Sequence, residues 1–192
     1  MALLETDAFS QVFRLTNREI WIVTAADGDR RGGLTATWVS QASLDPLRPM
    51  VVVAIAPIHQ TAQLIQAGGG FGLHLIRRDQ VDLACRFGLV SGRQQDKFSG
   101  LALTTAATGA PILQDCLAWL DCQVLTRLEV GDRILFWADV VAGRVEAAEE
   151  PLSDRELLAA ATAQQRTQLA QNLDRDITAL RPLHEAWRES LE

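Results

Sequence analysis

Two long runs of strand-forming residues, 118–130 and 133–146, are separated only by Gly131 and Asp132. Glycine and aspartate readily adopt the backbone conformations of a tight turn, so this segment predicts a long β-hairpin. Consecutive strands joined by so short a turn must run antiparallel, whereas a doubly wound sheet joins its parallel strands through helical crossovers. The hairpin therefore favours a small antiparallel barrel over a doubly wound fold.

Four further segments are rich in branched and aromatic residues and predict strands: 19–25, 34–43, 50–56 and 71–76. Residues 50–56 are apolar enough to be buried on both faces of a sheet. Short helices are expected at 62–67, capped by Thr61, and at 79–87. Five or six strands with short interspersed helices predict a mainly β fold with helices, a small barrel.

The pattern changes after residue 150 from strand-like to helical. Ser153 and Glu156 have the spacing of a capping box, in which each side chain bonds the other residue's amide. An amphipathic helix is then indicated by apolar residues at helical spacing: Leu169, Leu173, Ile177 and Leu180. Pro182 is expected to break or kink it, because proline lacks an amide hydrogen. We therefore expect a barrel domain over residues 1–150 and a helical extension over 151–192.

Charge and composition exclude several classes of protein. The net charge of the 192-residue chain is -6, and no run of Lys or Arg exceeds two residues, which argues against nucleic-acid binding. The longest apolar run, 50–56, is too short to cross a bilayer, and Glu5 and Asp7 argue against a signal peptide. We expect a cytoplasmic protein that binds neither nucleic acid nor membrane.

Cysteine and histidine spacing gives no metal or redox motif. The three cysteines form no C-x-x-C pair, so they are interpreted as buried thiols in a reducing cytosol. The three histidines, His59, His74 and His184, are scattered over the chain, and no metal site is expected.

The segment 33–43 has the composition of a ligand-binding strand. It contains five hydroxyl or amide side chains, more than a strand needs for packing: Thr35, Thr37, Ser40, Gln41 and Ser43. Small residues let a backbone approach a flat ring closely, while hydroxyls and amides donate to carbonyl and phosphate oxygens. Composition alone is also compatible with a half-exposed strand that has no ligand.

This segment resembles the flavin-binding strand of the flavin reductase-like family, the FMN-binding split barrels. The family pattern is Gly-hydrophobic-Thr-Ala-x-Trp-Val-x-x-x-Ser followed by x-Asp-Pro, and residues 33–46 match it. Further family motifs match in the same order: Thr-x-x-Leu-Ile at 61–65, Asp-Lys-Phe-x-Gly at 96–100, Gly-x-Pro-hydrophobic-Leu at 109–113 and Leu-x-Cys-x-Val at 120–124. The resemblance covers about residues 9–147. The stretch 38–43 also resembles the reductase domain fused to flavodiiron proteins.

The resemblance implies a Greek-key split barrel that binds FMN, commonly near the interface of a homodimer. It implies that four residues lie along the isoalloxazine ring, namely Thr35, Ala36, Thr37 and Trp38. Four more would donate to the ribityl chain and phosphate: Ser40, Gln41, Ala42 and Ser43. Thr61 would offer a helix N-terminus to the phosphate. Lys97 and Phe98 would close over the flavin, although Lys97 is alternatively a solvated surface lysine.

Two departures from the family pattern affect the expected site. Relatives often carry Lys-x-Arg after the third strand, where this chain has Pro57-Ile58-His59. His59 either replaces those cations when protonated or is an exposed loop histidine. Arg133, next to Asp132, replaces a histidine associated with nicotinamide; it either holds a dinucleotide phosphate or merely begins a strand.

Three functions follow from the resemblance. The first is an FMN-dependent oxidoreductase that takes a hydride from NAD(P)H at flavin N5, which requires no catalytic acid or base. The second is an FMN-binding electron-transfer module that serves a redox partner protein and does not oxidise nicotinamide. The third is a degenerate barrel without FMN that uses its tail for protein contacts.

Overall fold

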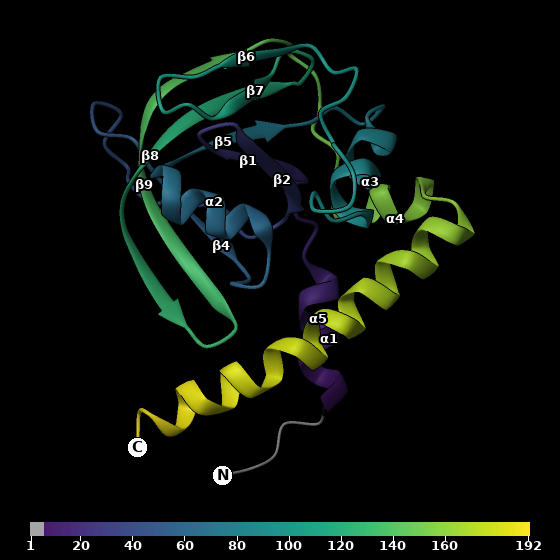
Figure 1. Cartoon of the computed structure of the whole chain (residues 1–192). Helices are drawn as coiled ribbons and strands as arrows, with labels where there is room; N and C mark the ends of the chain where they lie inside the picture. The colour runs from purple at the N-terminus through teal and green to yellow at the C-terminus, as the bar shows by residue number, and fades with distance from the viewer. Residues whose placement is uncertain (1–5) are drawn as a thin grey trace.

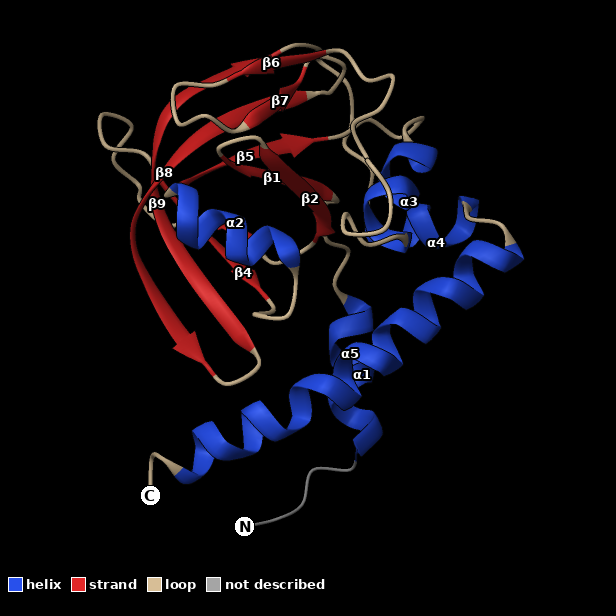
Figure 2. Cartoon of the chain, viewed as in Figure 1, coloured by secondary structure: helices blue, strands red, loops and turns tan. Residues whose placement is uncertain are grey.

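A strongly curved, seven-stranded antiparallel sheet dominates the computed structural model, which describes residues 6–192 (Figures 1 and 2). The strand order is β2-β1-β5-β8-β9-β4-β3. The strands are β1 (Trp21–Asp27), β2 (Arg30–Ala36), β3 (Val39–Gln41), β4 (Met50–Ile55), β5 (Gly70–Leu75), β8 (Ala118–Val130) and β9 (Arg133–Val145). A separate pair, β6 (Leu103–Thr105) and β7 (Pro111–Leu113), covers one end of the sheet.

The two edge strands of the sheet, β2 and β3, are separated in sequence only by Thr37 and Trp38. The sheet therefore curls until its opposite edges approach each other, as in a half-barrel. The crossing is fixed to β4 by a hydrogen bond from the Ala54 amide to the Trp38 carbonyl, 3.0 Å. The prediction of one strand over residues 34–43 is wrong, because the chain leaves one edge of the sheet at Thr37 and joins the other at Val39.

Helix α2 (Gln60–Gly68) lies against the concave side of the sheet (Figure 1). Leu64 and Ile65 are almost fully buried there among apolar residues of β1, β4, β5 and β9. The helix ends at Gly69, whose φ of 75° lies in the left-handed region that glycine favours. The residue that precedes the helix is His59, so the expectation that Thr61 caps it is wrong; Thr61 lies inside the first turn.

Strand β4 is buried on one face only, which corrects the expectation of burial on both. Val51, Val53 and Ile55 are buried, while Val52 and Ala54 between them are half-buried. This alternation is usual in an antiparallel sheet whose outer face is not covered by helices. The strand therefore presents an apolar outer surface.

The predicted hairpin is confirmed as β8 and β9, which pair along their length around the Gly131-Asp132 turn. Gly131 has a φ of 64°, as a tight turn requires. Register shifts after Asp121 and after Val124 bend the hairpin and add to the curvature of the sheet.

The C-terminal region consists of α4 (Asp154–Ala160) and α5 (Ala163–Glu189). The predicted capping box of Ser153 and Glu156 is confirmed, and a second one, Thr162 with Gln165, begins α5. Helix α5 continues through Pro182, so of the two expected effects, a break or a kink, the break does not occur. The missing amide leaves only the carbonyl one turn earlier without its partner, and that carbonyl belongs to the exposed residue Thr178, where water can bond it.

Helix α4 is joined closely to the barrel. Leu152 and Leu157 lie in a core cluster with residues of β1 and of α3 (Val81–Leu89). The Ile20 amide donates to the Leu152 carbonyl at 2.8 Å.

The domain boundary at residue 150 stays a prediction. Within residues 6–192, no helix is both long and apolar enough to cross a membrane. The remaining helix is α1 (Thr6–Leu15).

Candidate functional site

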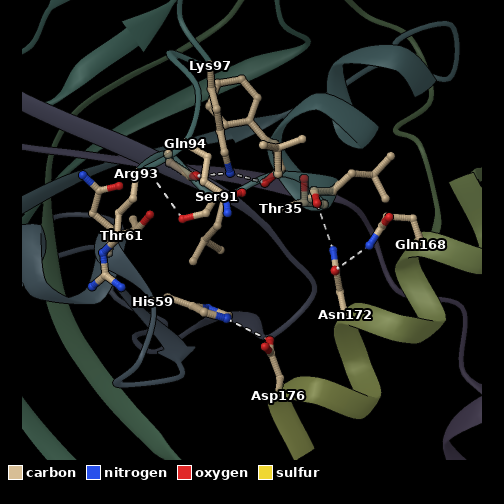
Figure 3. Close-up of a pocket in the computed structure, with 18 of the residues that line it drawn as sticks. Thr35, His59, Thr61, Ser91, Arg93, Gln94, Lys97, Gln168, Asn172 and Asp176 are labelled. Atoms are coloured by element: carbon tan, nitrogen blue, oxygen red, sulfur yellow. Dashed lines mark hydrogen bonds and ion pairs between the residues drawn. The ribbon is translucent and has the colours of Figure 1, made fainter. Parts of the chain in front are cut away.

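A cavity of about 950 Å³ lies between the sheet edge, the start of α2, the loop after α3 and the side of α5 (Figure 3). Four of the residues expected to bind flavin line it: Thr35, His59, Thr61 and Lys97. They come from β2, the start of α2 and the Asp-Lys-Phe motif, so the fold brings three separate sequence motifs to one place. Its volume is typical of a pocket for a cofactor-sized ligand.

The floor of the cavity is formed by β2 packed against α3. The Thr35 hydroxyl donates to the Ala84 carbonyl at 2.7 Å. Gly33 has no room for a larger side chain, because a Cβ atom there would lie 2.7 Å from the Phe87 ring and 2.9 Å from the Val23 carbonyl oxygen. The small residues of the sequence motif thus serve close packing of the floor.

Lys97 is buried, so the alternative of a solvated surface lysine is wrong. Its ammonium group donates to the carbonyls of Gly33 at 3.0 Å and Phe87 at 2.7 Å, and lies over the Phe87 ring. Burial lowers the pKa of Lys97 to about 8, because desolvation disfavours the charged form. Lys97 joins β2 to α3 and places a cation at the cavity wall.

The first turn of α2 faces the cavity through His59, Gln60 and Thr61. Amides in the first turn of a helix lack intrahelical partners and favour an anion. The Gln60 side-chain oxygen is buried, yet it has no hydrogen-bond partner in the described part of the chain. A buried acceptor without a donor is what a ligand bearing hydroxyl groups would satisfy.

His59 is held by the C-terminal helix. Its Nε2 atom lies 2.9 Å from a carboxylate oxygen of Asp176 on α5, and both side chains are partly exposed. The imidazole therefore faces a carboxylate, which reduces its value as a free cation for a phosphate.

Arg93 lines the same cavity and was missed in the sequence (Figure 3). Its guanidinium donates to the Gln63 side-chain oxygen at 2.9 Å, which places the cation beside the first turns of α2. The signal available was an arginine in the polar loop that leads into the Asp-Lys-Phe motif. Polar residues of α5 that line the cavity were also missed: Gln165, Gln168, Asn172, Arg175 and Asp176.

The other residues expected at the flavin lie outside this cavity. Ala36 is buried at the end of β2, and Thr37 and Trp38 form the crossing to β3. Phe98 is in the core, with its ring edge-on to Phe87 at 5.4 Å between centroids. The donors of the following stretch have local partners: Ser40 donates to the Gln41 carbonyl, and Gln41 to the Ser43 carbonyl. Ala42 donates its amide to the Met50 carbonyl.

Asp132 and Arg133 lie at the hairpin turn, next to the sheet crossing. Arg133 donates to the Asp132 carboxylate at 2.9 Å, and its guanidinium stacks 4.6 Å from the centroid of the Trp38 ring. His184 of α5 lies 3.6 Å from the same carboxylate. The guanidinium is thus held over the indole by this contact and by the Asp132 carboxylate.

The remaining candidate residues have structural roles. His74 is fully buried; its Nδ1 faces the Ile22 carbonyl and its Nε2 accepts from the Leu113 amide, and burial lowers its pKa to about 4. All three cysteines are free and buried, and burial raises the pKa of each thiol. No group of three potential metal ligands occurs within the part of the chain that the structure describes.

Sequence comparison assigns most of the chain to one domain type. The family model described as "Flavin reductase like domain" matches residues 13–162. The diflavin flavoprotein A 1 of Synechocystis sp. is 34% identical over 147 residues, which is 76% of this chain and 25% of that protein. The chain thus spans about a quarter of the length of this curated relative.

Structural comparison gives the same architecture. A flavin reductase domain protein from Arthrobacter sp. superposes with a TM-score of 0.69 at 26% identity, covering 77% of this chain and 89% of the other. An FMN-binding protein from Thermus thermophilus gives 0.65 at 26% identity, covering 76% and 78%. The expectation of a mainly β split barrel with a C-terminal helical segment is confirmed by these matches.

Proposed function

The chain belongs to the flavin reductase-like domain family, and from that membership we propose that it is an FMN-binding flavoprotein that oxidises NAD(P)H. The observation that carries the proposal is the cavity itself. In it, Thr35 and Lys97 lie on the same lining as the first turn of α2, which contains Thr61. When bound, FMN would supply the hydride acceptor at its N5 atom.

The groups around the cavity fit the polar parts of FMN. The first-turn amides of α2 and the Arg93 guanidinium are donors for a phosphate. The unsatisfied Gln60 oxygen is an acceptor for a ribityl hydroxyl. The net charge of the cavity supports an anion, because Arg93, Lys97 and Arg175 outnumber the single carboxylate of Asp176.

The ring of the flavin is proposed to extend from Thr35 toward Trp38, with Ala36 and Thr37 beneath it. These residues follow one another along the end of β2 and the crossing, so their backbone leads from the cavity to the seam of the sheet. Residues 40–43 follow Trp38: Ser40 and Gln41 belong to the exposed edge strand β3, and Ala42 and Ser43 come directly after it. The outer end of a bound ligand therefore has access to them. His59 and Phe98 support the site: His59 precedes α2, and Phe98 packs edge-on against Phe87, over whose ring the Lys97 ammonium lies.

Arg133 is the proposed contact for a dinucleotide. Its guanidinium is held on Trp38 and by Asp132 at the end of the proposed flavin face, where a phosphate can approach from solvent. Such a cation positions the donor, and no side chain is required to transfer a proton.

Anaerobic mixing of the purified chain with FMN and NADH or NADPH tests the proposal. Loss of the visible flavin absorbance at a rate above that of free FMN with the same nucleotide is expected. Absorbance that persists with both nucleotides would sink the reductase function while leaving flavin binding to be read from the bound spectrum.

A second function, an FMN-binding electron-transfer module, is supported by the absence of the family's nicotinamide-associated histidine, which Arg133 replaces, and by the similarity to a diflavin flavoprotein. In this alternative Arg133 contacts no dinucleotide. In that case the bound flavin is reduced by dithionite or by a partner protein, but not by nicotinamide. The same anaerobic experiment, followed by addition of dithionite, separates the two functions.

A homodimer is also proposed. The outward-facing side chains of two neighbouring strands, Val52 and Ala54 of β4 and Leu135 and Trp137 of β9, are apolar and only half-buried. Paired strands that present a continuous apolar face favour contact with a second copy. Light scattering on the eluting protein, with Trp137→Glu as the disrupting variant, tests this: a monomeric wild type would exclude the dimer.

A further inference from the structure

The residues of α5 that line the cavity are mostly polar. Gln165, Gln168, Asn172 and Asp176 recur at three- and four-residue spacing, so they share one face of the helix, and all of them line the cavity. The apolar residues Leu173 and Ile177 point elsewhere and are 60% and 45% exposed. Leu180 is almost fully buried, and a Cβ atom on Gly88 would lie 3.8 Å from Leu169, so apolar packing holds the helix at these two positions. Between them, the face that α5 turns to the cavity is polar and suited to a polar ligand.

Two residues of this face bond opposite walls of the cavity (Figure 3). The side-chain NH2 of Asn172 donates to the Leu89 carbonyl at the end of α3, 3.0 Å. The side-chain oxygen of Asn172 accepts from the amide of Gln168, also at 3.0 Å. One turn further along, Asp176 is paired with His59 at the start of α2. The helix thus joins the end of α3 to the beginning of α2 across the cavity.

The C-terminal part of α5 has a separate anchor at the tip of the hairpin. A Cβ atom on Gly131 would lie 3.0 Å from the Cα atom of His184 and 3.4 Å from the Cβ atom of Trp187, so the turn and the helix are in close contact. On the other side, α4 precedes this helix and is packed against the barrel through Leu157. The cavity-facing segment is therefore fixed at both ends. It cannot move away from the cavity without breaking the bonds of Asn172 and Asp176.

We propose that α5 is a strap that retains the flavin as a resident prosthetic group, so that electrons leave through the bound cofactor and not as released reduced flavin. This inference rests on the proposed flavin binding in the same cavity. Each bond of the strap is partly exposed and individually weak, so the strap slows exchange without forbidding it.

The test is the rate of FMN release from the full chain, measured by the recovery of flavin fluorescence after dilution. The double variant Asn172→Ala/Asp176→Ala removes both bonds while keeping the helix. Its release rate is expected to rise by about tenfold or more, the effect of roughly 1.4 kcal/mol. Loss of the Asp176 carboxylate alone favours retention of an anion, so faster release reports the lost bonds. The matched control is Gln171→Ala/Asp174→Ala, which makes the same kinds of change at exposed positions of α5. Thermal unfolding of the FMN-free proteins verifies that all three are folded alike.

The outcomes separate the strap from the site. Wild type that binds FMN but releases it as fast as the double variant overturns the strap and leaves flavin binding intact. Equal acceleration in the control also overturns it, since the effect would then come from the helix in general. A wild type that takes up no FMN overturns the proposed function, and the strap with it.

Discussion

The ammonium group of Lys97 donates to the main-chain carbonyl of Gly33 across 3.0 Å, which ties the loop after α3 to the edge strand of the sheet. A second bond, to the Phe87 carbonyl, fixes the same group to α3. The residue that resembles a flavin-contacting lysine in the sequence is thus also a structural clamp. The charged ammonium group is largely desolvated, so its titration should affect the stability of the protein measurably.

Lys97 should make stability increase with pH in the alkaline range. Its folded pKa of about 8 lies below the ordinary 10.5, so between these values the unfolded chain binds more protons than the folded protein. The unfolding free energy therefore rises with pH in this window, and the desolvation penalty is fully present only below pH 8. Relative to Lys97→Met, the wild type should gain on the order of 1 kcal/mol between pH 8 and 10. Urea unfolding followed by tryptophan fluorescence measures it; a pH-independent difference would contradict the burial of the charge.

Gly33→Ala should destabilise the protein by about 1–3 kcal/mol, because the added carbon overlaps the Phe87 ring and the Val23 carbonyl. Gly88→Ala is the matched control. It lies in the last turn of α3, where a Cβ atom would meet Thr35 only at 3.4 Å, an ordinary contact. Alanine also favours the helix over glycine, so this control should be neutral or up to about 1 kcal/mol more stable. Thermal denaturation compares the two, and equal losses would refute the close packing of β2 on α3.

Arg93→Gln should weaken FMN binding by about tenfold while leaving riboflavin binding unchanged, because the guanidinium is proposed to bind the phosphate. Arg144→Gln, an exposed arginine on β9 away from the cavity, controls for the change in net charge. Fluorescence titration with both flavins gives the two dissociation constants. If both flavins weaken together, Arg93 shapes the cavity and does not recognise the phosphate.

Local features of the fold could be predicted because neighbouring residues determine them. The Gly131-Asp132 turn and the Ser153 capping box depend on backbone conformation and side-chain reach within a few residues, and both were confirmed. The interruption of the predicted strand at Thr37 and Trp38 could not be predicted, because it depends on how strongly the whole sheet is curved. The absence of a break at Pro182 has a related reason: an exposed helix can lose one internal bond to water without ending there.

The site was predictable only where its residues lie in recognisable motifs. Thr35, His59, Thr61 and Lys97 come together as the family pattern implies. Arg93 and Asp176 belong to no such motif, and the Asp176–His59 pair joins residues 117 positions apart. Hydrophobic periodicity predicted an amphipathic helix from Leu169, Leu173, Ile177 and Leu180. The structure buries Leu180 but exposes Leu173 and Ile177. Which side of a helix faces a cavity depends on tertiary contacts that a periodic pattern does not contain.

The short crossing between β2 and β3 has a consequence for how such a chain can vary in length. The two edge strands of the sheet are joined by only two residues. One residue added or deleted in this link would turn every side chain of β3 to the opposite face of the sheet. The Leu44–Arg48 region, exposed and outside the strands, absorbs such changes without altering the register. The link at Thr37 and Trp38 is thus a position of fixed length, and homologous chains are expected to differ in its residue types but not in their number.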